Sequence, residues 1–302
     1  MVDIDTVLGY DGAQAAGTGL VLTSSGEILT NNHVVEGSTS ITVTVVATGQ
    51  SYQASVGTDL TADVAVLQLG GASGLSTANL AGSAVTVGDA VTGVGNAGGV
   101  GGTPAASPGT VTATDRQITT QAEGSAAAET LTGLIETDAD IQAGDSGGPL
   151  FNAADQVVGI DTAAEQGGYT TAGYAIPIST AVSIAGRIES GQGSTTITIG
   201  YPAFLGVQVS PTTTGDRYRS LQPTTTAGAL ISGVVTGGPA ERAGLTAGDT
   251  ITGIDGTAIG GTADLTSVLA GHTPGQTVTI TWTDTTGSVH NAAATLATGP
   301  AA

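Results

Sequence analysis

The sequence predicts an all-β double six-stranded barrel followed by a small α+β domain. Short apolar segments with the character of strands recur every 8–12 residues or so, separated by turns rich in the 49 glycines. A Gly- and Ser-rich segment then interrupts the pattern near residues 190–194, and helical periodicity follows it. A length of 302 residues suits about two domains, at roughly 150 residues each.

Each barrel is predicted from six strand-like segments. Alternating or continuous apolar character marks the first set at 2–8, 18–23, 28–30, 40–47, 51–56 and 64–69. The second set lies near 90–94, 109–114, 132–137, 149–151, 156–162 and 171–176, and a short helix is expected at 178–189. We therefore predict a first domain over residues 1–190 and a linker over residues 191–200.

The remaining residues, 201–302, have a different pattern. Strands are expected at 203–210, 229–235, 277–282 and 292–296, with helices at 239–243 and 262–270. Pro239 suits a first helical turn and Gly244 a helix end. The segment 262–270 carries apolar residues at the i, i+3, i+4 spacing of an amphipathic helix. These features predict an α+β domain of about 100 residues.

The charge of the chain excludes several classes of partner. There are 25 acidic residues against five arginines, no lysine, and a net charge of −20. Such a field repels phosphate backbones and anionic lipid surfaces, so nucleic-acid binding is not expected. No apolar run approaches the ~18 residues of a membrane span. There is no cysteine, and the His and carboxylate residues lack the spacing of metal ligands, so no metal is expected.

The strongest chemical signal is the run Gly144-Asp-Ser-Gly-Gly-Pro149. Attack on an amide needs an activated hydroxyl and donors for the oxyanion. Ser146 supplies the hydroxyl, and the flanking glycines let the backbone adopt unusual φ/ψ. We predict Ser146 as the nucleophile and the backbone N–H groups of Gly144 and Ser146 as the oxyanion hole.

A base for this nucleophile must come from few candidates. Of the three histidines, only His33 lies in the first domain, where an Asn-rich turn follows a strand. Asp63 begins an apolar strand, and a buried carboxylate needs a partner, which His33 can be. Asp59 competes with Asp63, but we interpret it as a turn residue with a solvated side chain. The order His33, Asp63, Ser146 is that of chymotrypsin, and it places the cleft between the two barrels.

These blocks resemble the HtrA serine proteases, and more closely their PepA-like actinobacterial members. The resemblance rests on residues 30–35, 63–69 and 141–150, with further matches at 93–98, 135–138 and 174–177. It implies a chymotrypsin-like serine protease domain followed by a PDZ domain, acting as an endopeptidase on unfolded or damaged proteins without a cofactor. It also implies a secreted or cell-envelope location. Met1 leads directly into a strand, so we expect a trimmed chain without its export signal.

The resemblance also extends to the second domain. The segment Phe204-Leu205-Gly206-Val207 resembles the carboxylate-binding loop of PDZ domains, and residues 238–249 resemble a segment that these domains carry before a strand. PDZ domains bind C-terminal or exposed peptide ends by strand addition. Polypeptide substrates and C-terminal peptides are therefore the expected partners.

Three departures from the family pattern concern specificity, activation and assembly. Asp140 stands where relatives usually have Ala, near the primary specificity pocket, so we expect either a preference for basic residues or an ordinary surface carboxylate. Asp145 stands where many relatives have Asn, but activation by a new N-terminal amine is not expected. Family members often trimerise through residues before the first strand, and this chain has almost none. A homo-oligomer therefore stays an open expectation. Substrate contacts are expected from Asp140, Ile141, Thr162, Ala163 and Ala164.

Two alternative interpretations complete the predictions. The segment Gly93-Val-Gly-Asn-Ala-Gly98 matches a dinucleotide-binding pattern, but glycines and Pro104 break any following helix, so it is interpreted as a barrel turn. The rival to an active enzyme is a latent protease that acts mainly as a peptide-binding chaperone or adaptor. An incomplete triad would favour that rival, and the triad here is complete.

Overall fold

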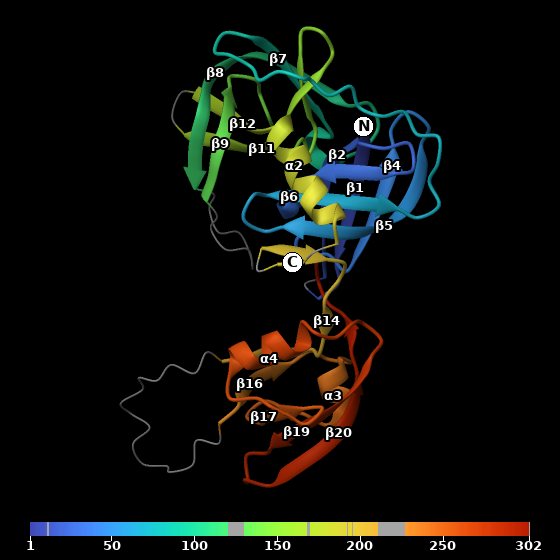
Figure 1. Ribbon diagram of the computed structural model, residues 1–302, viewed down its shortest axis with the longest axis vertical. Helices are drawn as coiled ribbons and strands as arrows, with labels where there is room; N and C mark the ends of the chain where they lie inside the picture. Colours follow the sequence, from blue (N-terminus) through green and yellow to red (C-terminus); the bar gives the residue numbers. More distant parts are fainter. Residues whose placement is uncertain are drawn as a thin grey trace. The chain divides into compact units, whose positions relative to one another are not determined.

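The computed structural model describes residues 1–10, 12–119, 130–167, 170–191, 193–194, 196–210 and 227–301. They form two compact units (Figure 1). The first comprises Met1–Gly200 together with Ala301–Ala302, and the second comprises Tyr201–Pro300.

Six antiparallel strands close the first barrel of the first unit. Strand β5 pairs with both β4 and β6, which completes the ring. In β4 the sequence Ser-Ile-Thr-Val-Thr-Val buries every second side chain, as expected for a strand with one face toward the core. The strands, in order around the barrel, are β1 (Val2–Leu8), β2 (Ala13–Val21), β3 (Glu27–Thr30), β6 (Val64–Leu69), β5 (Gln50–Asp59) and β4 (Ser40–Val45).

A second closed barrel follows, so the predicted pair of six-stranded barrels is confirmed. Its strands in spatial order are β10 (Pro149–Asn152), β11 (Val157–Gly167), β12 (Thr170–Pro177), β9 (Thr130–Thr137), β8 (Ala105–Thr119) and β7 (Ala90–Gly95). Strand β8 is longer than the predicted 109–114. Its first part, 105–110, pairs with β7 although it consists of Ala, Ser, Pro, Gly and Thr, most of which favour strands weakly.

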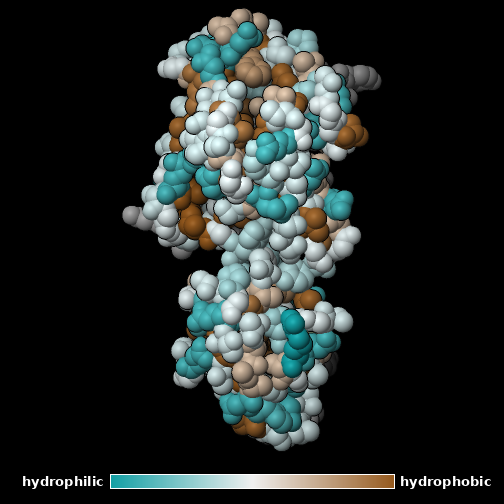
Figure 2. Space-filling view, turned by 90° about the vertical axis from the view of Figure 1, so that its right-hand side faces the viewer, coloured by the Kyte–Doolittle hydropathy of each residue, from teal (hydrophilic) through white to brown (hydrophobic). Residues whose placement is uncertain are grey.

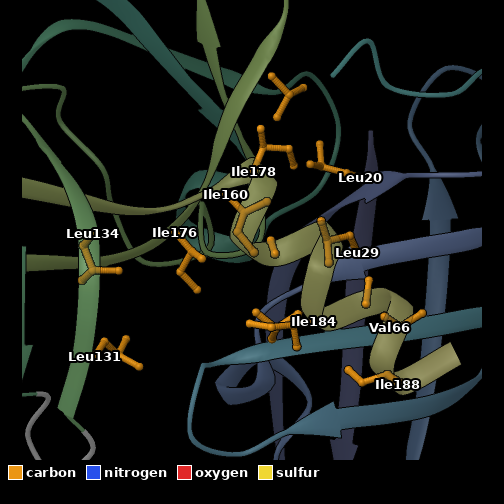
Figure 3. Packing of buried hydrophobic residues seen from close by; sticks show 14 of the residues in the cluster. Leu20, Leu29, Val66, Leu131, Leu134, Ile160, Ile176, Ile178, Ile184 and Ile188 are labelled. Atoms are coloured by element: carbon orange, nitrogen blue, oxygen red, sulfur yellow. The ribbon is translucent and has the colours of Figure 1, made fainter. Parts of the chain in front are cut away.

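Helix α2 (Ile178–Glu189) joins the cores of the two barrels. Its buried Ile178, Ile184 and Ile188 pack in one apolar cluster with Leu29 of the first barrel and Ile160 of the second (Figure 3). Each such side chain contributes roughly 1.5–3 kcal/mol by burial. This shared core fixes the barrels relative to each other, and so fixes groups that they carry on facing loops.

The predicted linker, residues 191–200, is not free of regular structure. Ile197–Ile199 form strand β13, which pairs with β5 of the first barrel. Gly57 on β5, which faces β13, leaves room for helix α2, because a side chain there would collide with Ile188. Ala301 also belongs to the first unit: its C=O accepts the Gly37 N–H, and its N–H donates to the Ser38 C=O.

The second unit is an α+β domain, as predicted. Its main sheet has the order β15 (Val207–Val209), β16 (Ala229–Val234), β17 (Thr250–Ile254), β19 (Thr277–Thr283) and β20 (Val289–Thr295). Smaller pairings involve β14 (Ala203–Phe204) with β21 (Ala297–Thr298), and β18 (Thr257–Ala258) with β17. The expected helices are α3 (Pro239–Ala243) and α4 (Thr262–Leu269), and Gly244 ends α3 in the left-handed region.

The surface mixes hydrophilic and hydrophobic residues over the face shown in Figure 2. In the described ranges, the large apolar side chains that remain exposed are Val7, Tyr10, Val87, Val100, Val182, Ile199 and Val289. Among the described residues, no helix has both the length and the apolar character needed to cross a membrane.

Candidate active site

His33 lies on a short helix, where the sequence predicted an Asn-rich turn. Strand β3 ends at Thr30, and α1 (Asn32–Val35) follows. Asn31 anchors the start of this helix, because its side-chain amide donates to the C=O of Asp63 at 2.9 Å. The side chain of His33 is 42% exposed, so the ring faces the solvent side of the barrel while the helix beneath it is buried.

Asp63 is buried at the start of β6 and lies against His33. Its carboxylate accepts the His33 backbone N–H at 3.0 Å, and both of its oxygens lie 3.0 Å from His33 Nδ1. The hydroxyl of Thr162 donates to Oδ2 as well. The backbone of Asp63 is left-handed, with φ +51°. Asp63 is only 2% exposed, and burying a carboxylate without hydrogen-bond donors would be strongly unfavourable. These donors supply the hydrogen bonds that it needs.

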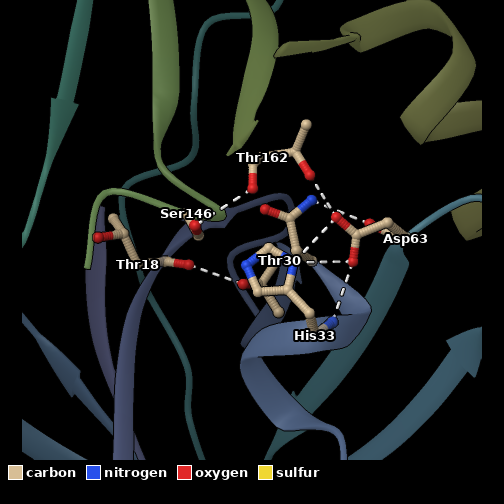
Figure 4. Close-up of polar contacts among 7 residues, drawn as sticks. Thr18, Thr30, His33, Asp63, Ser146 and Thr162 are labelled. Atoms are coloured by element: carbon tan, nitrogen blue, oxygen red, sulfur yellow. Dashed lines mark hydrogen bonds and ion pairs between the residues drawn. The ribbon is translucent and has the colours of Figure 1, made fainter. Parts of the chain in front are cut away.

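Ser146 reaches the same place from the second barrel (Figure 4). It lies in the loop between β9 and β10, and its Oγ donates to the Thr162 C=O at 3.4 Å. Its own C=O accepts the Thr18 N–H of β2 at 2.8 Å, which ties the loop to the first barrel. Gly147 is required next to it, because φ is +82° and a side chain would collide with Thr18 and Thr30. Thr162 thus contacts both Ser146 and Asp63.

The loop before Ser146 is held in place by hydrogen bonds that the sequence did not predict. The Gly98 N–H donates to the Ala143 C=O at 2.7 Å, and Thr18 Oγ1 donates to the Gly144 C=O at 2.8 Å. Gly144 itself has φ +96°, and a side chain there would collide with the backbone of residues 96–99. Among the described residues, neither the Gly144 nor the Ser146 N–H donates a hydrogen bond to a backbone group.

The segment 93–98 accordingly has a structural role beyond the turn that was predicted. It ends strand β7 and leads into the 3-10 turn η1 (Ala97–Gly99), which carries the Gly98 N–H. Asn96 fixes this turn through its side-chain oxygen, which accepts the Gly101 N–H at 2.7 Å.

The predicted substrate-binding residues divide into exposed and buried groups. Asp140 is exposed, and its Oδ2 accepts the Gln142 side-chain amide at 2.8 Å. Ile141 is 2% exposed and fills the space that Gly93 and Gly173 leave by having no side chain. Ala163 and Ala164 belong to β11, and their side chains lie outside the described residues.

The predicted peptide-binding segment of the second unit connects two strands. Phe204 ends β14 and Val207 begins β15, with Gly206 between them at φ +78°. The C=O groups of Leu205 and Gly206 accept the N–H groups of Ala240 and Val235, both at 2.9 Å. In the described part of the chain, β15 is an edge strand that pairs only with β16. Its outer edge can therefore accept an added strand.

The interpretation of Asp59 as a solvated turn residue was wrong. Asp59 is 1% exposed, and its Oδ1 accepts both the backbone N–H and the hydroxyl of Thr61. Its Oδ2 lies 3.6 Å from Arg187 of α2. The ion pair crosses from the first barrel to a helix that is distant in sequence, so the local pattern could not predict it.

Replacing Thr162 with valine is expected to lower kcat/KM by about tenfold or somewhat more, because a hydrogen bond to a charged group contributes about 1.5–3 kcal/mol. Valine keeps the shape of threonine but removes the hydroxyl that donates to Asp63. Thr162→Ser keeps the hydroxyl and should retain most of the activity. Steady-state kinetics on a peptide substrate would compare the three proteins, and equal losses in both variants would contradict a role for the hydroxyl.

Comparisons with known proteins agree with this geometry. A trypsin-like peptidase domain model matches residues 17–160, and a PDZ domain model matches residues 203–283. A probable periplasmic serine endoprotease, DegP-like, of Bartonella henselae is 36% identical over 88% of this chain and 50% of its own length. The serine protease PepD of Mycobacterium tuberculosis is 34% identical over 98% of this chain and 63% of its own.

Solved structures of the HtrA type resemble the whole chain. The HtrA-type protease AlgW with tripeptide has 31% sequence identity and a TM-score of 0.53, with 99% of this chain and 94% of that chain covered. The same protease with decapeptide gives 31% identity and a TM-score of 0.51. The chain spans about half the length of the first curated relatives that it matches. It belongs to the HtrA-type serine protease family, with a trypsin-like peptidase domain followed by a PDZ domain.

Proposed function

We propose that the protein is a serine endopeptidase that hydrolyses peptide bonds of unfolded proteins through an acyl-enzyme. The observation that carries the proposal is the convergence of His33, Asp63 and Ser146 from two barrels, with Thr162 contacting both Asp63 and Ser146. No cofactor is needed for this chemistry, because the triad supplies the nucleophile and the base.

The proposed reaction assigns one step to each group. Ser146 Oγ attacks the substrate carbonyl carbon while His33 takes its proton, and His33 then returns that proton to the leaving amine. Asp63 holds the ring through Nδ1, which leaves Nε2 as the base. Water, activated by His33, then cleaves the acyl-enzyme and restores Ser146.

The oxyanion of each tetrahedral intermediate would be held by the N–H groups of Gly144 and Ser146. Donors already aimed at the place where charge develops contribute most when they need no rearrangement. The contacts from Thr18 and from Gly98 fix this loop before substrate binds. This arrangement supports an enzyme that is competent at rest.

The primary specificity pocket is proposed to accept small aliphatic side chains. The buried side chain of Ile141 occupies the space between Gly93 and Gly173 and limits the depth of the pocket. Asp140 is exposed and hydrogen-bonded to Gln142, so a surface role suits it better than selection of basic residues.

The PDZ domain is proposed to bind the free C-terminus of a polypeptide along β15. A carboxylate would meet the backbone N–H groups of Leu205, Gly206 and Val207, and the peptide would add a strand to the edge of the sheet. Because the relatives are named as periplasmic, we further propose a cell-envelope or secreted location. Self-association stays a prediction.

Digestion of β-casein, an unfolded protein substrate, would test the proposed function. The parent protein is expected to produce fragments, and mass spectrometry should place most cuts after small aliphatic residues. A Ser146→Ala protein serves as the matched control for contaminating proteases. A folded parent that leaves casein intact would exclude endopeptidase activity under those conditions and would favour the latent alternative.

A peptide-binding experiment would test the PDZ assignment separately. A peptide with a free C-terminus is expected to bind the Ser146→Ala protein at least about tenfold more tightly than the same peptide with a C-terminal amide, since hydrogen bonds to a charged group contribute about 1.5–3 kcal/mol. Titration calorimetry measures both affinities. Equal affinities would contradict carboxylate recognition.

A further inference from the structure

Two buried carboxyl groups lie beneath the loop that carries Ser146, and the proposed mechanism uses neither. Asp145 directly precedes Ser146 and is 4% exposed. Asp161 is on β11, directly before Thr162, and has no exposed surface. Asp145 lies in the loop before β10 and Asp161 on β11, and no sequence pattern assigns a role to Asp161.

Asp145 shapes the turn that presents Gly144. Its Oδ2 accepts the Gln142 N–H at 2.9 Å, and its own N–H donates to the Gln142 C=O at 3.0 Å. The side chain and the backbone of one residue thus close the turn over 142–145. Its second oxygen, Oδ1, is buried and has no hydrogen-bond partner among the described residues.

Asp161 is tied to the nucleophile loop through its backbone alone. Its N–H donates to the Gly148 C=O at 2.9 Å, and its C=O accepts the Gly147 N–H at 2.8 Å. Both carboxyl oxygens lack a partner within the described part of the chain. Burial raises the pKa of Asp161 well above its usual value, and the negative charge of Asp145 raises it further. Both effects favour the neutral, protonated form of Asp161.

The two carboxyl groups face the same side of strand β7. The position that a side-chain carbon would take on Gly93 is 3.0 Å from Asp161 Oδ2, and the position on Gly95 is 2.6 Å from Asp145 Oδ1. Residues two apart on a strand share a face, so the missing side chains make room for both acids.

Few charges surround this pair. Ala175 of β12 lies opposite Asp161, and Gly148 precedes β10, so neither neighbouring strand brings a titratable side chain at these positions. In the described part of the chain, the charge of Asp140 also acts on the pair, and it raises the pKa of Asp145 in addition to the effect of burial. Among the described residues, Asp161 has no salt-bridge partner.

We propose that Asp161 is a positioning residue for the oxyanion loop, and that it acts only as a neutral carboxylic acid. The inference rests on the proposed function. With Asp161 neutral, Asp145 is the single negative charge of the pair and can keep its hydrogen bond to the Gln142 N–H. Ionised Asp161 would place a second negative charge beside it without a counter-ion. Asp145 would then move away, and the turn over 142–145 would lose the bond that shapes it.

The pH dependence of turnover would test this proposal. The parent protein is expected to lose kcat reversibly as the pH rises through the raised pKa of Asp161, with a smaller change in KM, because the oxyanion contacts form in the transition state. Asp161→Asn is nearly isosteric and never ionises, so its kcat should not show this alkaline loss. Its kcat at neutral pH should stay within about tenfold of the parent. Asp115→Asn, an exposed carboxylate on β8, should behave as the parent does.

Two results of that experiment would overturn the proposal. One is an alkaline loss of kcat that is the same in Asp161→Asn and the parent, or absent from both. The other is a folded Asp161→Asn protein that is inactive at neutral pH, because the neutral side chain would then be insufficient.

Stability measurements distinguish failure of this inference from failure of the proposed function. In the unfolded chain Asp161 ionises near its ordinary pKa of 3.8, whereas in the folded chain burial and the charge of Asp145 hold its pKa well above that value. The native state thus binds more protons, and the stability that the proton confers is lost as pH rises from about 4 to the folded pKa. Asp161→Asn should remove this decline.

Glu27→Gln is the matched control for the stability profile. Burial raises the pKa of Glu27 to about 7, with further contributions from its hydrogen bond to Glu189 and from the charge of Glu189. Glu27 therefore also makes the free energy of unfolding fall as pH rises, over a range that ends near pH 7. An inactive parent would refute the proposed function. If the free energy of unfolding instead depends on pH identically in the parent and in Asp161→Asn, Asp161 does not hold a proton in the folded chain.

Discussion

Replacing Ser146 with alanine is expected to lower kcat by about a million-fold, the loss found when a serine-protease nucleophile is removed. Alanine removes the attacking oxygen while the oxyanion donors at residues 144 and 146 keep their positions. A residual rate above that of uncatalysed hydrolysis is therefore expected, because oxyanion and substrate binding survive. Initial rates on a quenched fluorescent peptide would measure the loss.

The same substitution should leave the fold intact. Within the described part of the chain, the hydrogen bond from Ser146 Oγ to the Thr162 C=O is long, at 3.4 Å, so little stability depends on it. Thermal unfolding should therefore be nearly unchanged, and C-terminal peptides should bind as before. Ser83→Ala, in an exposed loop of the same barrel, serves as the control. Substantial activity in a pure Ser146→Ala protein would show that another group is the nucleophile.

Replacing Asp63 with asparagine is expected to lower kcat by about 10⁴, the magnitude known for this change in a Ser-His-Asp triad. The amide cannot accept hydrogen bonds at both of its terminal atoms. His33 Nδ1 would face an N–H donor or change tautomer, and its Nε2 would no longer be the base. The loss should appear in kcat more than in KM, and stopped assays on the fluorescent peptide would resolve both.

The backbone at Asp63 favours this variant as a clean test. Its φ of +51° lies in the left-handed region, which Asn tolerates well among non-glycine residues. The matched control is Asp59→Asn, because Asp59 is equally buried but pairs with Arg187 and Thr61 instead of His33. Asp59→Asn should lower the free energy of unfolding and leave kcat nearly unchanged. An Asp63→Asn protein with kcat within tenfold of the parent would remove Asp63 from the mechanism.

Sequence patterns predicted most of the fold because its signals are local. Strand β4 alternates Ile and Val with polar residues, and such a pattern fits a half-buried strand and little else. Pro239 and Gly244 mark the two ends of α3 for equally local reasons. The sequence patterns missed two segments in which packing overrides local strand propensity. The Ala- and Pro-containing first part of β8 pairs with β7. Strand β13 lies inside the predicted linker and pairs with β5.

The candidate triad could be named from sequence because its residue types and their order are distinctive. Three histidines leave one base in the first domain, and the Gly-rich run around Ser146 specifies an unusual backbone. The supporting groups have no such signature. Thr18, Asn31 and Thr162 are common polar residues, and each acts through a partner at least 32 positions away in the chain.

By itself, then, the sequence determined two β-barrels and an α+β domain, and it named His33, Asp63 and Ser146 as the candidate triad. Only the tertiary structure decided which carboxylates are buried, because burial depends on strands that meet from distant parts of the chain. Asp59 is one example, since Arg187 of α2 meets it from more than 100 residues away. Asp161 is the other: its burial and its raised pKa follow from the strands around it and from Asp145, and no neighbour in the sequence reveals them.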